Sequence, residues 1–260
     1  MTIDEILAKL EDPSIEPGFK DWRNCLVFWA RPTKAVRSLI EEVQEKLKDV
    51  VPSLWIMTQM SLHMTALEVT HSLTAGEIET LVEQMQPHIE AIADYTLNHR
   101  ARLVKPMVSY DAQALALSFL PASEEPGQSG NDSYTYHHLR RDLFTQVSAT
   151  GVKVASRYVI PSAHLTIGRF IKKADFEKSD GRVDHAKIEN LVAKIEEINK
   201  WLEREYWPSE GVIKEGGEWV VGEETGLTCR KGTLWYGAGG ETIYQGKGFE
   251  PSKLEGTEDR

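Results

Sequence analysis

The stretch SLHMTAL at residues 61–67 returns in altered form as SAHLTIG at residues 162–168. Both copies read His-x-Thr within an apolar run, and their histidines lie about a hundred residues apart. Successive side chains of a β-strand point to opposite faces of its sheet. The histidine and threonine of each copy are therefore predicted to share one face of a strand: His63 with Thr65, and His164 with Thr166. Two such strands side by side would line a cleft with two imidazoles.

Strict alternation also places the residues that follow each motif. It sets Leu67 on the face of His63 and Glu68 on the opposite face. It turns Arg169 away from His164, so that Arg169 reaches the cleft only if a β-bulge interrupts the second strand. Without that bulge, a salt bridge behind the sheet is the expected role of Arg169.

The two motifs occupy equivalent places in a repeated order of elements. A helix is predicted from Thr33 to about residue 49 and another from Ser133 to about residue 150; they begin 30 residues before the first motif histidine and 31 before the second. This agreement indicates a duplicated strand–helix–strand–helix unit. Further helices are predicted at 2–10, from 74 to about 92, and at 184–206, and further strands at 25–30, 54–57, 104–110, 113–120, 155–160, 219–221, 227–230 and 233–236.

Short strands among long helices, several joined by hairpin-length links, indicate an α+β protein. We expect a bilobed duplicated unit, in which two antiparallel sheets face a central cleft and helices cover the outside. The expected domain spans residues 25–250, with lobes of about 25–120 and 133–250 whose strands are free to intertwine. Residues 1–24 are expected to form a helix and linker, and residues 251–260 a flexible tail. The polar segment that separates the lobes, residues 121–132, is expected to be a tolerated insertion rather than a mobile flap.

Length, charge and cysteine content limit the class of protein. With 260 residues, 41% of them hydrophobic, the chain can bury a sizeable core, and no apolar run approaches the ~18 residues that a membrane helix needs. No secretory signal is visible and two cysteines make no disulfide framework, so a cytoplasmic protein is expected, with the nucleus as an alternative. The formal net charge of −10 disfavours a long nucleic-acid tract as a partner. A nucleic-acid substrate is therefore expected to be small or held by its end, and no membrane partner is expected.

The paired motifs favour acid–base chemistry over the other classes considered. Zinc usually takes three or four protein ligands, and neither motif has a second ligand at a useful spacing. The chain also lacks a Gly-x-Ser-x-Gly elbow and a phosphate-binding P-loop, so no metal and no cofactor are expected. An unperturbed histidine pKa near 6.5 lets one imidazole take a proton from water while the other protonates a leaving oxygen. The threonine hydroxyls, on the same face, can donate hydrogen bonds to phosphate oxygens.

In these features the chain resembles the two-histidine (2H) phosphoesterase superfamily, which includes cyclic nucleotide phosphodiesterases and 2′-5′ RNA ligase-like proteins. The resemblance rests on the two His-x-Thr motifs in duplicated halves, on LVFWARP at residues 26–32 followed by a helix, and on HLTIGR at residues 164–169. It covers roughly residues 25–240. It implies a bilobed α+β fold, metal-free chemistry, and substrates that carry 2′,3′-cyclic phosphates or 2′-5′ linkages.

The resulting expectation is a metal-independent phosphodiesterase that hydrolyses a 2′,3′-cyclic phosphate on a nucleotide or RNA end. Its expected site residues are a catalytic pair, two phosphate ligands and three further substrate contacts: His63 and His164; Thr65 and Thr166; and Trp29, Arg31 and Arg169. The alternatives are a 2′-5′ phosphodiester hydrolase or ligase-like enzyme, and a non-catalytic module that binds nucleotides or RNA ends. Intact histidine and threonine in both motifs favour an enzyme, since a binding module needs no acid–base pair. The pattern assigns neither histidine as the base.

Overall fold

The computed structural model describes residues 1–123, 132–157, 162–209, 212–237 and 239–249. The helices are α1 (Glu5–Glu11), α2 (Lys34–Lys48), α3 (Ala75–Ala93), α4 (Tyr136–Ala149) and α5 (His185–Tyr206), with 3₁₀ turns η1 (Tyr95–Leu97) and η2 (Lys173–Asp175). The strands are β1 (Asn24–Ala30), β2 (Trp55–Ile56), β3 (Met64–Leu73), β4 (Arg102–Tyr110), β5 (Ala114–Pro121), β6 (Ala163–Arg169), β7 (Glu218–Val220), β8 (Thr225–Gly232) and β9 (Glu241–Lys247).

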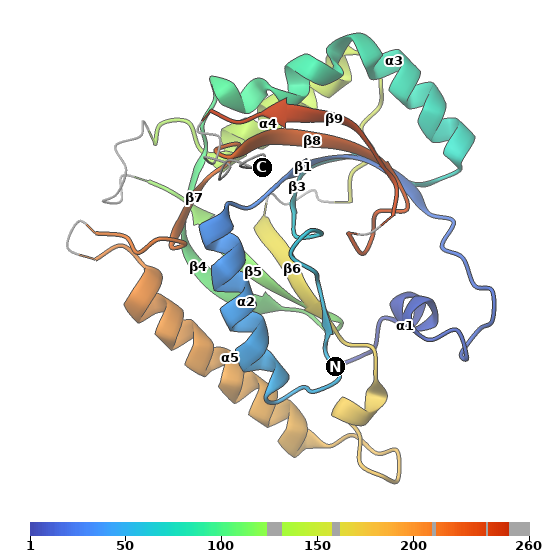
Figure 1. The fold of residues 1–260 in the computed structure, drawn as a ribbon, viewed down its shortest axis with the longest axis vertical. Coiled ribbons are helices and arrows are strands. Elements are labelled where there is room, and N and C mark those ends of the chain that lie inside the picture. The colour runs from blue at the N-terminus through green and yellow to red at the C-terminus, as the bar shows by residue number, and fades with distance from the viewer. Residues whose placement is uncertain (124–131, 158–161, 210–211, 238, 250–260) are drawn as a thin grey trace, which may run out of the picture.

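The strands form one antiparallel sheet whose two halves meet at a narrow join. The strand order is β7-β4-β5-β6-β3-β1-β8-β9, with β2 paired to β6. Between β6 and β3 only Met64 and Leu165 are paired. The predicted α+β class is confirmed, and the two predicted sheets are the halves of one curled sheet (Figure 1). Each half takes strands from both sides of the 121–132 segment, since β4 and β5 lie beside β6 while β8 and β9 extend β1.

Helices pack on both halves of the sheet, and their sequences explain where they begin. Helices α2 and α5 lie against the half that contains β4 and β6, and α3 and α4 against the half that contains β3 and β8 (Figure 1). Thr33 caps α2 by accepting a hydrogen bond from the backbone N of Val36, and Thr74 and Glu77 form a capping box at the start of α3. The apolar residues of the buried face of α2 recur at helical spacing: Val36, Leu39, Ile40, Val43 and Leu47. Burial of each such side chain contributes about 1.5–3 kcal/mol.

The structure corrects the sequence prediction in two segments. Residues 155–157 are irregular instead of forming a strand, and the backbone N of Ala155 donates to the carbonyl of Val69 at 2.8 Å; residues 158–160 lie outside the described residues. Residues 233–236 form a turn between β8 and β9, and β9 itself was missed. The sequence of β9, ETIYQGK, is polar and contains a glycine, so it lacks the apolar alternation of a half-buried strand.

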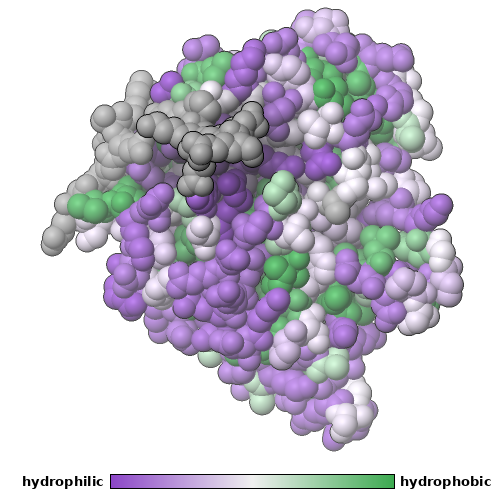
Figure 2. Space-filling view, viewed as in Figure 1, coloured by the Kyte–Doolittle hydropathy of each residue, from purple (hydrophilic) through white to green (hydrophobic). Residues whose placement is uncertain are grey.

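Two further predictions fall mainly outside the described part of the chain. Of the segment 121–132, residues 124–131 are not described, and Asp132 at its end forms an ion pair with Arg102 at 2.6 Å. The predicted tail, residues 251–260, is likewise outside the described ranges. Within those ranges no helix is long and apolar enough to cross a bilayer. Hydrophobic side chains form separate small patches on the face seen in Figure 2.

Candidate active site

A β-bulge interrupts β3 directly after the threonine of the first motif. Successive residues of β1 pair with Thr65 and Leu67, so Ala66 is an extra residue on β3. An extra residue reverses the alternation of faces beyond it. Leu67 therefore packs in the core, and Glu68 lines the same pocket as His63. The predictions that Leu67 shares the face of His63 and that Glu68 faces away were both wrong.

Strand β6 has a bulge at the same position of the second motif. Successive residues of β5 pair with Thr166 and Gly168, so Ile167 is the extra residue. Arg169 thereby lines the pockets of both histidines. Arg169 was predicted to reach the cleft only if a β-bulge interrupts this strand, and the structure contains that bulge. Counted from the histidine of its motif, Arg169 occupies the same position as Glu68, five residues on.

The two motifs meet where the halves of the sheet join. Met64 and Leu165 directly follow the two motif histidines, and they form the one β3–β6 residue pair. Continued by one residue in each direction, this antiparallel register sets the histidine of each motif opposite the threonine of the other. The pocket that contains His63 and the pocket that contains His164 adjoin at Arg169. The structure therefore brings the four motif side chains together from segments that are distant in sequence.

His63 is held in one orientation and one tautomer. Its ring stacks on Trp29, with centroids 3.7 Å apart and an interplanar angle of 17°. Its Nδ1 lies 2.7 Å from the backbone oxygen of Ser61. Because a carbonyl only accepts, Nδ1 carries a proton, and Nε2 is the atom that gains or loses one. Burial, together with positive charge from neighbouring arginines, lowers the pKa of His63 to about 3.

His164 is held by the backbone and the side chain of Ser162. Its Nδ1 lies 2.8 Å from Oγ of Ser162, a group that can donate or accept. Burial is the main cause that lowers the pKa of His164, and the charges of Arg140 and Arg169 act in the same direction. A backbone hydrogen bond with Ser162 and the charge of Asp111 oppose them. Both imidazoles are therefore mostly neutral at neutral pH. A bound anion would offset the arginine charges and favour protonation.

Arg31 and Arg230 concentrate positive charge beside His63. Their guanidinium carbons lie 5.0 and 4.7 Å from the ring centroid of Trp29. Burial lowers the pKa of both, that of Arg31 to about 10 with repulsion from Arg230 and Arg37 adding to the effect. Within the described ranges no carboxylate pairs with Arg31 or Arg230. An anion at this point would relieve a repulsion that the protein leaves uncompensated.

Trp29 was predicted to contact the substrate, but its side chain is buried behind His63. It is only 1% exposed, and His63 covers one face of its ring. The indole thus supports the imidazole and the two arginines around it. Arg31, by contrast, is half-buried close enough to His63 for its charge to act on that imidazole, and its Nη1 donates to the carbonyl oxygens of Met60 and Leu62 at 3.2 and 3.0 Å.

Several charged residues of the cleft were missed from the sequence. Arg157 donates to the buried carboxylate of Glu68 through its backbone N, at 2.8 Å, and through its guanidinium, which also lies 3.7 Å from the ring centroid of Trp235. These three residues line the His63 pocket, about 190 Å³ in volume. Arg140 of α4 donates to the carbonyl of Thr65 at 3.3 Å, and its charge lowers the pKa of His164. No local motif marks these side chains, because bulges and contacts between distant segments place them.

The described residues offer no cluster for metal binding. No group of three or more His, Cys, Asp or Glu side chains among them is arranged to hold a metal ion. Cys25 and Cys229 are both buried and free. Burial, the main cause, raises the pKa of each thiol, and that of Cys229 to about 12. Cys25 lines the His63 pocket and Tyr110 the His164 pocket, beside the imidazoles, Arg157, Arg169, Glu68 and Asp111.

The chain was compared with protein-family models, with curated protein sequences and with solved structures. Neither the family models nor the curated sequences give a match. Among solved structures, TT0787 of Thermus thermophilus is 15% identical with a TM-score of 0.47, over 87% of this chain and 98% of that chain. E. coli LigT in apo form is 12% identical with a TM-score of 0.44, over 86% and 97%. Kluyveromyces marxianus Usb1 with uridine monophosphate is 11% identical with a TM-score of 0.43, over 85% and 97%.

Proposed function

We propose that this protein is a two-histidine phosphodiesterase that hydrolyses a 2′,3′-cyclic phosphate, on a nucleotide or RNA end, without a metal ion. One observation carries the proposal. Two imidazoles, each tied through Nδ1 to a serine two residues earlier, line adjoining pockets of one arginine-rich cleft. Such a pair supplies the base and the acid that hydrolysis of a phosphodiester requires.

The surroundings of the two histidines suggest how the roles divide. His63, with its proton fixed on Nδ1 and a low pKa, presents a free lone pair on Nε2 and acts as the base. His164 acts as the acid in its imidazolium form, which the hydrogen bonds with Ser162 and the charge of Asp111 favour. Water attacks phosphorus as His63 takes its proton. The bond to the leaving ribose oxygen breaks as that oxygen takes the proton of His164, and a monophosphate results.

The remaining side chains are assigned by the charge that develops on phosphate. The hydroxyls of Thr65 and Thr166 donate to the non-bridging oxygens, and Arg31 and Arg169 balance their negative charge. Trp29 holds the imidazole of His63 in place. The substrate is small, because outside this cleft an acidic protein of net charge −10 repels a longer polyanion.

One feature favours a second candidate, the hydrolysis of a linear 2′-5′ phosphodiester. The pockets of His164 and His63, of about 280 and 190 Å³, lie on either side of Arg169. A linear diester has a nucleoside on each side of its phosphate and would use both pockets. A cyclic mononucleotide has one nucleoside and would use one.

The test is to incubate EDTA-treated protein with 2′,3′-cyclic AMP and, separately, with a 2′-5′-linked diadenosine monophosphate, with phosphorus NMR as the assay. We expect the cyclic substrate to give one monophosphate isomer in the presence of EDTA. Faster turnover of the linear diester would select the second candidate. Activity that disappears with EDTA and returns with zinc or manganese would contradict the metal-independent mechanism. Binding of AMP with no turnover of either substrate would indicate the non-catalytic module.

A further inference from the structure

We propose that Asp4 is a positioning residue that holds Arg169 toward the bound phosphoryl group, so that the N-terminal segment is part of the active site. The inference rests on the proposed function in one respect, the assignment of Arg169 to phosphate. Asp4 lies outside the repeated unit and far from both motifs in sequence, so only its contacts place it at the site.

The Asp4 carboxylate connects three parts of the molecule. It is 8% exposed, its Oδ2 accepts from Nη1 of Arg169 at 3.1 Å, and its Oδ1 accepts from the hydroxyl of Tyr236 at 2.9 Å. Oδ1 also accepts from the backbone N of Leu7 at 3.1 Å and so caps α1. The guanidinium of Arg169 lies 5.4 Å from the ring centroid of Tyr236. Asp4 and Tyr236 thus hold one side of Arg169 from two different segments.

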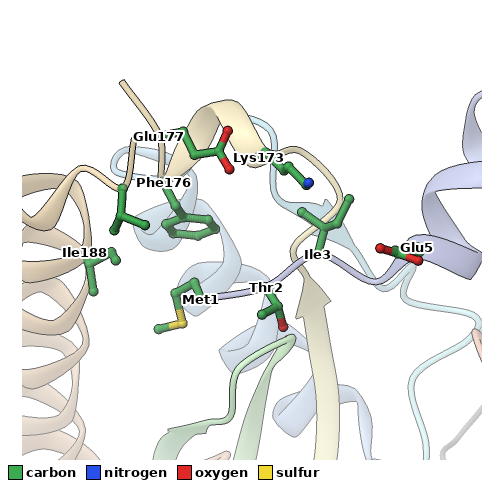
Figure 3. A pocket seen from close by; sticks show the side chains of 9 residues that line it. Met1, Thr2, Ile3, Glu5, Lys173, Phe176, Glu177 and Ile188 are labelled. Atoms are coloured by element: carbon green, nitrogen blue, oxygen red, sulfur yellow. The ribbon is translucent and has the colours of Figure 1, made fainter. Parts of the chain in front are cut away.

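The backbone around Asp4 is fixed to the same strand. The backbone N of Asp4 donates to the carbonyl of Phe170, the residue directly after Arg169, at 2.8 Å. Thr2 donates in the same way to Ala112, in the turn between β4 and β5, at 2.8 Å. The first residues also pack against the segment that follows β6, where they line a pocket of about 310 Å³ that includes Phe176 and Lys173 (Figure 3). These contacts hold the carboxylate in register with Arg169.

Arg169 needs such a partner because little else orients it. Its side chain is 19% exposed, and its Nε is buried without a hydrogen-bond partner among the described residues. A guanidinium presents five N–H donors in a planar fork, so Asp4 can hold one edge while other donors face the cleft. In the first motif the equivalent position is Glu68, which Arg157 neutralises. Only the second motif therefore delivers a cation from this position.

The hydroxyl of Tyr236 is suited to hold Asp4. Burial is the main cause that raises the pKa of Tyr236 to about 12, so the phenol stays protonated and can donate at neutral pH. Its oxygen also accepts from Nη2 of Arg23 at 3.4 Å, and Asp21 pairs with Arg23 at 2.6 Å. An unbroken series of ion pairs and hydrogen bonds thus connects Asp21 to Arg169 through Arg23, Tyr236 and Asp4.

The test compares Asp4→Asn with Glu5→Gln. Asparagine is as good an N-cap as aspartate, so Asp4→Asn keeps α1 while it removes the charge that holds Arg169. We expect kcat/KM to fall about 10- to 100-fold, the effect typical of a small misplacement in an active site. Glu5→Gln removes the same charge one residue later, where the described contacts include none with Arg169, and should change kcat/KM less than about 2-fold. Tyr236→Phe should give a smaller loss than Asp4→Asn. Thermal unfolding of each variant checks that the fold is intact.

A double-mutant cycle separates positioning from a structural role. If Asp4 acts through Arg169, then Asp4→Asn should cause no further loss in an Arg169→Ala background. An equal loss with and without Arg169 would overturn the inference. So would an Asp4→Asn variant that retains wild-type kcat/KM.

Calorimetric titration with AMP distinguishes failure of this inference from failure of the proposed function. We expect Asp4→Asn and Arg169→Ala to weaken AMP binding, and Glu5→Gln to leave it unchanged. If the wild type hydrolyses no diester but Asp4→Asn still weakens AMP binding, the inference stands and the proposed function fails. Equal binding by wild type and Asp4→Asn, or no binding by the wild type, would overturn the inference.

Discussion

His63 and His164 share a motif but differ in their surroundings, and those surroundings determine what each imidazole can do. Each imidazole is hydrogen-bonded to the backbone of the serine two residues earlier, and His164 in addition contacts the hydroxyl of its serine and has the charge of Asp111 nearby, which favours its protonated form. Trp29 covers one face of the first ring. Two residues with the same local sequence thus become candidates for opposite roles.

Replacement of either histidine should remove most of the activity. We expect His63→Ala and His164→Ala to lower kcat by about 10²–10⁴-fold each, the range of general acid–base groups. The double variant should lose less than the product of the single losses, because the two act in one step. Thr65→Val and Thr166→Val should lose about 10- to 10³-fold, since water can partly replace a hydroxyl donor. A folded His63→Ala or His164→Ala variant with near wild-type turnover would exclude that histidine from catalysis.

The pH dependence of kcat/KM should show the two depressed pKa values of the free protein. The proposed base, His63, is neutral above about pH 3, and the proposed acid, His164, is protonated only below its pKa, which lies under 6.5. The value of kcat/KM should therefore fall as pH rises through a point below 6.5. The kcat profile should lie at higher pH, because bound phosphate favours the imidazolium. His164→Ala should lose the alkaline limb and His63→Ala the acid limb, and a wild-type kcat/KM that rises up to pH 8 would contradict these roles.

The motif residues could be predicted because a repeated pattern marks them. His63, Thr65, His164 and Thr166 recur at one spacing within apolar strands, and alternation alone gives them a common face. Glu68 could not be placed in this way, because a bulge is set by pairing with a neighbouring strand. The same holds for Asp4, Arg157 and Arg230, which contact Arg169, Glu68 and Trp29 from segments that have no pattern in common.

At the level of elements, the bulge of β6 is clamped from behind by α2. Gln44 of α2 is 5% exposed, and its Nε2 donates to the carbonyl of Ile167, the extra residue of the bulge, and to that of Met57, both at 2.9 Å. The backbone N of Met57 also donates to the carbonyl of Ile167 at 3.1 Å. Gln44 thus supports the turn of backbone that brings Arg169 into the cleft.

Gln44→Met should weaken both the fold and the site. It keeps the side-chain length but leaves two buried carbonyls without this donor, which should lower the free energy of unfolding by about 1–3 kcal/mol. Because Arg169 follows the bulge, kcat/KM should fall as well, even at a temperature where the variant is fully folded. Glu41→Gln, on an exposed position of the same helix, is the control. Chemical denaturation and steady-state kinetics provide the measurements, and unchanged stability would show that the clamp is unimportant.

Elements with their own start signals were predicted well, and elements defined by partners were not. Helices α2, α3 and α5 begin at capping residues and carry apolar stripes, so their ends were close to those observed. Strand β9 was missed and residues 233–236 were wrongly predicted as a strand, because β8 and not a local pattern determines which residues pair. In the same way, no local signal shows that β4 and β5 leave the first lobe to lie beside β6.

At the scale of the whole molecule, the charge around the active site is opposite in sign to the net charge of the protein. The chain carries a formal charge of −10, yet Arg31, Arg140, Arg169 and Arg230 all act on the imidazoles of the cleft. A small anion is therefore attracted by the positive charge of the cleft, whereas a long polyanion is also repelled by the acidic remainder of the surface.

Short substrates should therefore be preferred. We expect a 2′,3′-cyclic mononucleotide to be turned over at least as efficiently as a long RNA that ends in the same group, compared by kcat/KM at equal ionic strength. Added salt should reduce activity on the mononucleotide only modestly, since few charges take part. A strong preference for long RNA that weakens steeply with salt would show an extended binding surface that the net charge does not suggest.

The single residue pair between β3 and β6 also bears on the direction of the reaction. Half a turn about Met64 and Leu165 would carry each His-x-Thr motif onto the other. Microscopic reversibility requires the return reaction to use the same two groups with donor and acceptor exchanged. The same two imidazoles would therefore serve the reverse step, with His164 as the base and His63 as the acid. Whether the phosphodiester is hydrolysed or formed would then depend on the concentrations of water and product, and not on the arrangement of the site.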